Sequence, residues 1–199
     1  MSIFLICFIS FSIIGAIFLF HAVEQVPLKV LTRDIVSTGD LPVYIGLLSQ
    51  LGIFIWAATA AICLFASQVL HSKGNQRYLI IASAISLYLG IDDAFLLHES
   101  VFPAIGIHQK IVIASYGLLM AVFLWNYRKT ILSTDYLLMA IAFICFATSI
   151  LIDNLFWKRS PLITNLLEDG AKFVGLVAWI TYFARTAKQF IRGERLETA

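Results

Sequence analysis

The sequence has few charged residues for its length. Only 13% of its 199 residues are Asp, Glu, Lys or Arg, about half of the roughly 25% that soluble domains carry. Hydrophobic residues make up 60% of the chain, with 16 Phe and 4 Trp. This leaves too little polar surface to cover a water-soluble globule, so a lipid bilayer must solvate much of the exterior. We therefore expect an all-α fold, a polytopic transmembrane helix bundle.

Several familiar functional patterns are also missing. The formal net charge is only +2, which excludes the concentrated basic surface of a nucleic-acid-binding protein. The cysteines Cys7, Cys63 and Cys145 are odd in number, lie in apolar runs and form no CxxC pair, so neither a disulfide framework nor a structural zinc site is indicated. No Ser stands in a G-x-S-x-G context, and a serine hydrolase is unsupported.

The apolar runs predict about six membrane spans in one domain, residues 1–199. About 20 apolar residues cross a bilayer as a helix, and the candidate runs are residues 3–21, 42–70, 78–101, 107–127, 136–157 and 162–190. The first run lacks a basic leader and is longer than a signal-peptide core, so we expect a retained helix.

Basic residues predict the orientation of these spans. The side of the termini carries Lys73, Arg77, Arg128, Lys129, Arg185, Lys188, Arg192 and Arg195, and the other side carries Lys29, Arg33, Lys110, Lys158 and Arg159. Because cytoplasmic flanks are enriched in Lys and Arg, this excess predicts that both termini are cytoplasmic.

Acidic residues and histidines gather at the opposite, non-cytoplasmic face. With six alternating spans, that face collects His21, Asp92, Asp93, His98, Glu99, Asp153, Glu168 and Asp169. Ionisable groups within spans cost at least ~2.5–3.5 kcal/mol each, so they normally face the bundle or a watery cavity. Asp92 and Asp93 lie deepest, and their expected partners are Lys172, His98 or a bound cation.

The cluster has the composition of a divalent-metal site. The candidate ligands for Zn, Fe, Mn or Mg are Asp93, His98, Glu99 and Glu168. The catalytic candidates are Asp92, Asp93 and Glu168, and the supporting candidates are His21, Asp153, Asp169 and Lys172. Asp92 and Glu99 are seven residues apart and are expected to share nearly one face of the third span, whereas His98 is expected to point about a third of a turn away.

Two kinds of chemistry fit such a cluster. A metal-activated water would hydrolyse a lipid ester, amide or phosphoester at headgroup level. Without a metal, a carboxylate with a raised pKa would act as general acid or base. Membrane lipids are the expected partners, and because the chain is small, a homo-oligomer is a further possibility.

Three other interpretations remain open. Buried acids and a lysine suit a proton- or cation-coupled transporter or channel subunit. A membrane assembly factor would pair the same charges with a partner's spans, and the charges can also be ordinary interfacial residues. Between the acidic cluster and the basic residues at their cytoplasmic ends, the third, fifth and sixth spans contain apolar and hydroxyl side chains only, which favours a site at one face over a path across the membrane.

Two short motifs carry a resemblance to known families. G-I-D-D-A-F-L-L-H-E (Gly90–Glu99) and L-E-D-G-A-K-F-V-G (Leu167–Gly175) resemble paired D-[DE]-x4-H-E and E-D-x2-K-x2-G motifs of small, uncharacterised bacterial polytopic membrane proteins. The resemblance implies one site built by the residues of both motifs and a bacterial inner-membrane location, but no activity. A looser similarity is to alkaline ceramidase-like membrane hydrolases, although this chain has no H-x3-H motif and six rather than seven predicted spans.

Overall fold

The computed structural model describes residues 3–33, 35–42, 44–156 and 161–197, and within them it contains helices and no strand. The predicted all-α fold class is therefore confirmed. The chain divides into two compact units, Met1–Leu47 and Leu48–Ala199. The first unit contains α1 (Ile3–Glu24), α2 (Leu28–Thr32) and α3 (Ile35–Gly39).

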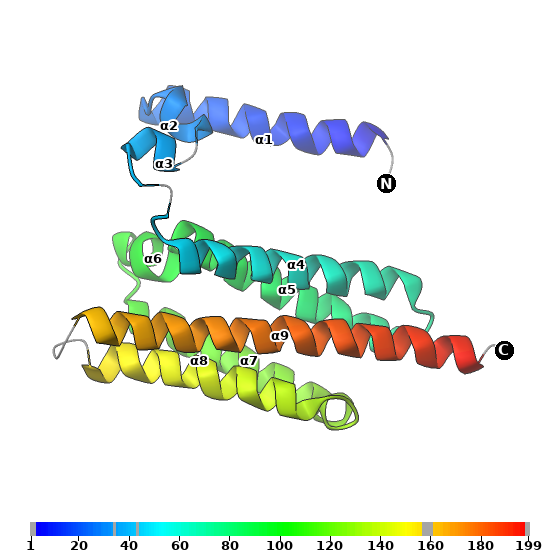
Figure 1. The fold of residues 1–199 in the computed structure, drawn as a ribbon. Helices are drawn as coiled ribbons and strands as arrows, with labels where there is room; N and C mark the ends of the chain where they lie inside the picture. The colour runs from blue at the N-terminus through cyan, green and yellow to red at the C-terminus, as the bar shows by residue number, and fades with distance from the viewer. Residues whose placement is uncertain (1–2, 34, 43, 157–160, 198–199) are drawn as a thin grey trace. The chain divides into compact units, whose positions relative to one another are not determined.

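The second unit is a bundle of long antiparallel helices (Figure 1). Its elements are α4 (Leu47–Val69), α5 (Lys73–Phe95), a π-helical turn η1 (Leu97–Val101), α6 (Phe102–Ala104), α7 (Gln109–Leu132), α8 (Tyr136–Phe156) and α9 (Pro161–Glu197). Short connections at residues 70–72 and 133–135 force α4 and α5, and likewise α7 and α8, to run in opposite directions. The helices α4, α7 and α9 therefore begin at the end of the bundle where α5 and α8 finish.

Among the residues that the structure describes, four helices are long and apolar enough to cross a membrane. They are α4, α5, α7 and the segment Tyr136–Asp153 of α8. A shorter apolar helix, Ser10–Glu24, lies in the first predicted span, and α9 is 37 residues long. These helices make the chain suited to membrane integration, and the count of six spans stays a prediction.

Aromatic side chains fill the middle of the bundle. Trp179, Tyr78, Tyr182 and Phe183 are fully buried. The rings of Trp56 and Trp179 meet edge to face with their centroids 5.8 Å apart, an arrangement that aromatic pairs favour. This aromatic layer is a packed core between the two ends of the bundle.

Glycine permits a close contact between two helices of this core. A Cβ atom on Gly90 of α5 would lie only 2.8 Å from the Cβ of Trp56 on α4. No larger residue fits there without displacing a helix. The contact sets Trp56 against the end of α5, directly beside the next residues of the acidic motif.

The antiparallel order gathers most of the acidic side chains of the bundle at one end. One end, hereafter the acidic end, carries Asp92, Asp93, His98, Glu99, Asp153, Glu168 and Asp169. The other, the basic end, carries Lys73, Arg77, Arg128, Lys129, Arg185, Lys188 and Arg192. Within the bundle, the parity of the helices thus places the acidic motifs at one end as the sequence indicated.

Candidate functional site

A helix break shapes the acidic end. We expected one helix to continue to residue 101, but α5 ends at Phe95. Leu96 adopts the left-handed conformation with φ 51° and ψ 44°, and η1 follows it. For a residue other than glycine, this conformation costs roughly 1–2 kcal/mol, and such strain concentrates at functional sites.

The break changes which side chains meet. The expectation that Asp92 and Glu99 share one helix face is wrong, because it required an unbroken helix. The chain instead turns back after Leu96, so that the backbone N–H of His98 donates to Asp92 Oδ1 at 2.9 Å. The imidazole follows, and its Nδ1 donates to Asp92 Oδ2 at 2.5 Å.

Asp92 is the buried centre of this first network. The residue is 3% exposed, and its Oδ1 also accepts a hydrogen bond from the Tyr116 hydroxyl of α7 at 2.9 Å. Three donors thus offset the cost of burying the carboxylate. They also fix the His98 ring, because an imidazole whose Nδ1 donates to a carboxylate has its orientation and tautomer set by that bond.

His98 is held as an imidazolium. Its hydrogen bond to Asp92, reinforced by one to Glu99, raises the pKa of His98 from 6.5 to about 9. The Glu99 Oε1 lies 3.5 Å from His98 Nε2, and the imidazolium lowers the pKa of Glu99. Both residues lie in η1, beyond the end of the candidate span, and their side chains are 18% and 53% exposed. At neutral pH a partly accessible N–H acid therefore lies beside an accessible carboxylate.

Asp93 forms a second, separate network. Lys172 of α9 donates from Nζ to Asp93 Oδ1 at 2.7 Å, and the Trp56 indole N–H donates to Oδ2 at 2.9 Å. The Asp93 side chain is 10% exposed and the Lys172 side chain 40%. The ion pair joins α5 to α9, and the indole joins α4 to both, so three helices are fixed at this end.

A small pocket opens beside this ion pair. It has a volume of about 40 Å³, which is enough for water. Asp93 and Lys172 meet Asp169 there, and the lining is Leu48, Ser49, Gly52, Asp93, Asp169, Lys172, Phe173 and Leu176. Polar groups from α5 and α9 thus reach a common space at the acidic end.

The remaining predicted residues take other positions. Asp153 at the end of α8 acts electrostatically on Glu168 near the start of α9, and like charges repel there. His21 lies in the first unit, where its Nδ1 bonds the Val26 carbonyl at 2.6 Å. Among the described residues, no three His, Cys, Asp or Glu side chains converge as metal ligands would.

Sequence reasoning missed Trp56 and Tyr116, which complete the two networks. A signal for them does exist, because a buried indole or phenol needs a hydrogen-bond partner. Trp56 is 3% exposed, and the unpaired acids of the next helix were the natural acceptors. Nothing in a single sequence, however, says which acid faces which aromatic residue.

Comparison with known proteins gives one family. The model of a domain of unknown function (DUF8692) matches residues 4–186, nearly the whole chain. Comparison with curated proteins and with solved structures gave no match.

Proposed function

The chain belongs to the family of the domain of unknown function DUF8692, and we propose that this member is a membrane-embedded hydrolase. Its substrate would be a lipid or lipid-linked molecule whose scissile bond lies at headgroup level. The observation that carries the proposal is the Asp92–His98 pair, in which a buried carboxylate orients a partly accessible imidazolium.

The protonation states of His98 and Glu99 support an acid and a base in adjacent positions. The raised pKa of His98 keeps a proton on the imidazole at neutral pH, whereas the lowered pKa of Glu99 keeps that carboxylate ionised. Environments that separate the pKa values of neighbouring groups are typical of acid–base catalysis. Because His98 Nε2 and Glu99 Oε1 lie 3.5 Å apart, both groups can contact one polar substrate group from the same side.

The reaction follows from these roles. Glu99 would take a proton from water as the water oxygen attacks the acyl carbon or phosphorus of the substrate. His98 would donate the Nε2 proton to the leaving oxygen, so that an acid and an alcohol are released. Asp92 would not exchange protons but would hold the ring and stabilise its charge. Lys172, Asp93 and Asp169 line the neighbouring pocket and would orient a polar headgroup.

The packing below the site favours chemistry at one face over transport. The Trp56 indole that holds Asp93 meets the Trp179 ring edge to face, and the Phe146 ring stacks on Trp56 with centroids 5.8 Å apart. A proton or cation relay needs polar groups that continue across the membrane. The aromatic packing beneath Asp93 therefore supports a site at one face of the membrane over such a relay.

The test uses the full chain in detergent–lipid micelles. We would incubate it with a total membrane lipid extract and follow new fatty acids, lysolipids and phosphoalcohols by mass spectrometry. Wild-type protein should release a product, and His98→Gln should reduce the rate by about 10²–10⁴-fold, the range for a lost general acid. The matched control is His108→Gln, which removes an exposed imidazole from the start of α7 and should leave the rate unchanged.

Two further arms separate the alternatives. Loss of the activity on chelation, with recovery on adding a divalent ion, would replace water activation by Glu99 with metal-assisted hydrolysis. Proton or cation flux in proteoliposomes, with no product from any lipid, would contradict the hydrolase and favour a transporter.

A further inference from the structure

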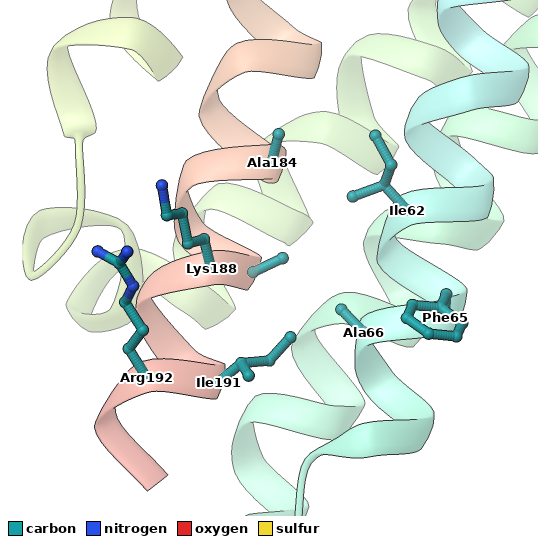
Figure 2. A pocket seen from close by; sticks show the side chains of 8 residues that line it. Ile62, Phe65, Ala66, Ala184, Lys188, Ile191 and Arg192 are labelled. Atoms are coloured by element: carbon teal, nitrogen blue, oxygen red, sulfur yellow. The ribbon is translucent and has the colours of Figure 1, made fainter. Parts of the chain in front are cut away.

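A second pocket lies at the basic end of the bundle, where α9 passes α4. It has a volume of about 380 Å³, within the range of ligand-binding sites. Figure 2 shows the side chains that line it, which are Ile62, Phe65, Ala66, Ala184, Ala187, Lys188, Ile191 and Arg192. None of them belongs to the networks at the acidic end.

The lining divides into an apolar interior and a charged rim. Ala66 and Ala187 line the pocket and are buried, while Ile62 of α4 and Ile191 of α9 extend toward the space between the two helices (Figure 2). Phe65 is 70% exposed, so a large apolar ring is available at the edge of the groove.

The rim carries two cations from one helix face. Ala184, Lys188 and Arg192 follow at intervals of four residues on α9, so they lie one above another along the helix. Lys188 and Arg192 are exposed, and no ion pair joins either of them to a carboxylate among the described side chains. Arg185, by contrast, is paired with Asp135 at 2.7 Å.

We propose that this groove binds an anionic phospholipid, with its phosphate at Lys188 and Arg192 and an acyl chain along Ile62, Phe65 and Ile191. A lipid is the ligand whose own chemistry matches this division, because it joins an anion to a hydrocarbon chain. Basic pockets between membrane helices recognise anionic headgroups in this way. The position along the membrane span also fits a lipid headgroup. The candidate span α4 ends at Val69, and Lys188 and Arg192 lie toward the same end of the bundle.

The proposal is tested by native mass spectrometry of the full chain in detergent micelles. Dioleoyl phosphatidylglycerol should bind more tightly than dioleoyl phosphatidylcholine. Neutralising each cation should lower the affinity for the anionic lipid roughly fivefold, so Lys188→Gln with Arg192→Gln should lower that affinity roughly 25-fold.

The chain offers a matched control for charge. Lys73 and Arg77 lie four residues apart on α5, at the same end, and are also exposed. Lys73→Gln with Arg77→Gln removes the same charge at the same spacing and should leave lipid affinity within about twofold, because these residues do not line the groove. An equal loss in both double variants would overturn the site in favour of general surface attraction.

The apolar half of the proposal has its own variant. Ala184→Phe fills the groove without changing its charge and should lower the affinity for the lipid at least roughly tenfold, since each acyl methylene displaced from the groove lowers the affinity about fourfold. Unchanged lipid binding by an Ala184→Phe variant that keeps the wild-type melting temperature would overturn the placement of the acyl chain in the groove. Equal affinity for phosphatidylcholine, or for glycerol phosphate without acyl chains, would overturn the assignment to an anionic lipid.

Discussion

The ion pair between Asp93 and Lys172 offers a quantitative test of the acidic end. Lys172→Met leaves the Asp93 carboxylate, only 10% exposed, with the Trp56 N–H as its one donor among the described contacts. Removing one partner of a fully buried pair costs 3–5 kcal/mol. Because Lys172 is 40% exposed, solvent screens part of this, and we expect about 2 kcal/mol of lost stability.

The interaction itself is measured by a double-mutant cycle. Asp93→Asn should cost about 1 kcal/mol, because the amide oxygen still accepts from Trp56 and the lysine can reach solvent. The double variant should lose less than the sum of the two single variants. The expected coupling energy is about 1.5 kcal/mol, the lower limit for a hydrogen bond to a charged group.

A second ion pair in the same bundle serves as the control. Arg185 and Asp135 are also 2.7 Å apart, but their side chains are 61% and 38% exposed. Exposed pairs contribute about 0.2–1 kcal/mol, so their cycle should give about 0.5 kcal/mol. Both cycles are read from unfolding in mixed micelles, followed by tryptophan fluorescence. Equal coupling energies in the two cycles would refute the reasoning that burial strengthens the Asp93 pair.

Three other changes test the packing and the local geometry. Gly90→Ala should destabilise the protein by about 1–3 kcal/mol, because the added Cβ would lie 2.8 Å from that of Trp56. The control Gly117→Ala lies in open space on α7 and should stabilise by up to about 1 kcal/mol. Equal effects of the two variants on the melting temperature would contradict the Gly90–Trp56 contact. Leu96→Gly should stabilise by about 0.5–1 kcal/mol by relieving the left-handed strain, and a loss of stability in chemical unfolding would argue against strain. Because folding raises the pKa of His98 from 6.5 to about 9, its contribution to stability is complete below about pH 6.5 and disappears as pH rises through about 9. His98→Gln should remove this slope, and a slope that persists would assign it to another group.

The fold could be predicted from the sequence because a membrane-spanning helix requires a long apolar run that is easily recognised. Apolar runs of the required length identified α4, α5, α7 and α8, and parity alone placed the acidic motifs at one end. The need to compensate buried carboxylates also indicated that Asp92 and Asp93 require partners. Lys172 and His98 were among the few residues able to serve, and each is found with one of these acids.

The pairing itself could not be predicted, because it depends on the break at Leu96. The segment A-F-L-L-H-E contains no Gly, Pro or Asn that would signal a helix end. The spacing of a continuous helix therefore predicted that His98 points away from Asp92. A leucine in the left-handed conformation is stabilised only by its tertiary surroundings. Those surroundings include the hydrogen bond of Tyr116 to Asp92, a contact between helices for which one sequence gives no register.

The protonation of His98 tests the central claim most directly. ¹⁵N NMR of histidine-labelled full chain in micelles would follow its imidazole across pH, and His98→Gln would assign its signal among the 4 histidines. We predict that His98 titrates near pH 9 and that Asp92→Asn returns its pKa toward 6.5. A wild-type His98 that is already neutral at pH 7 would contradict the account, because the oriented proton donor at the acidic end would then be absent.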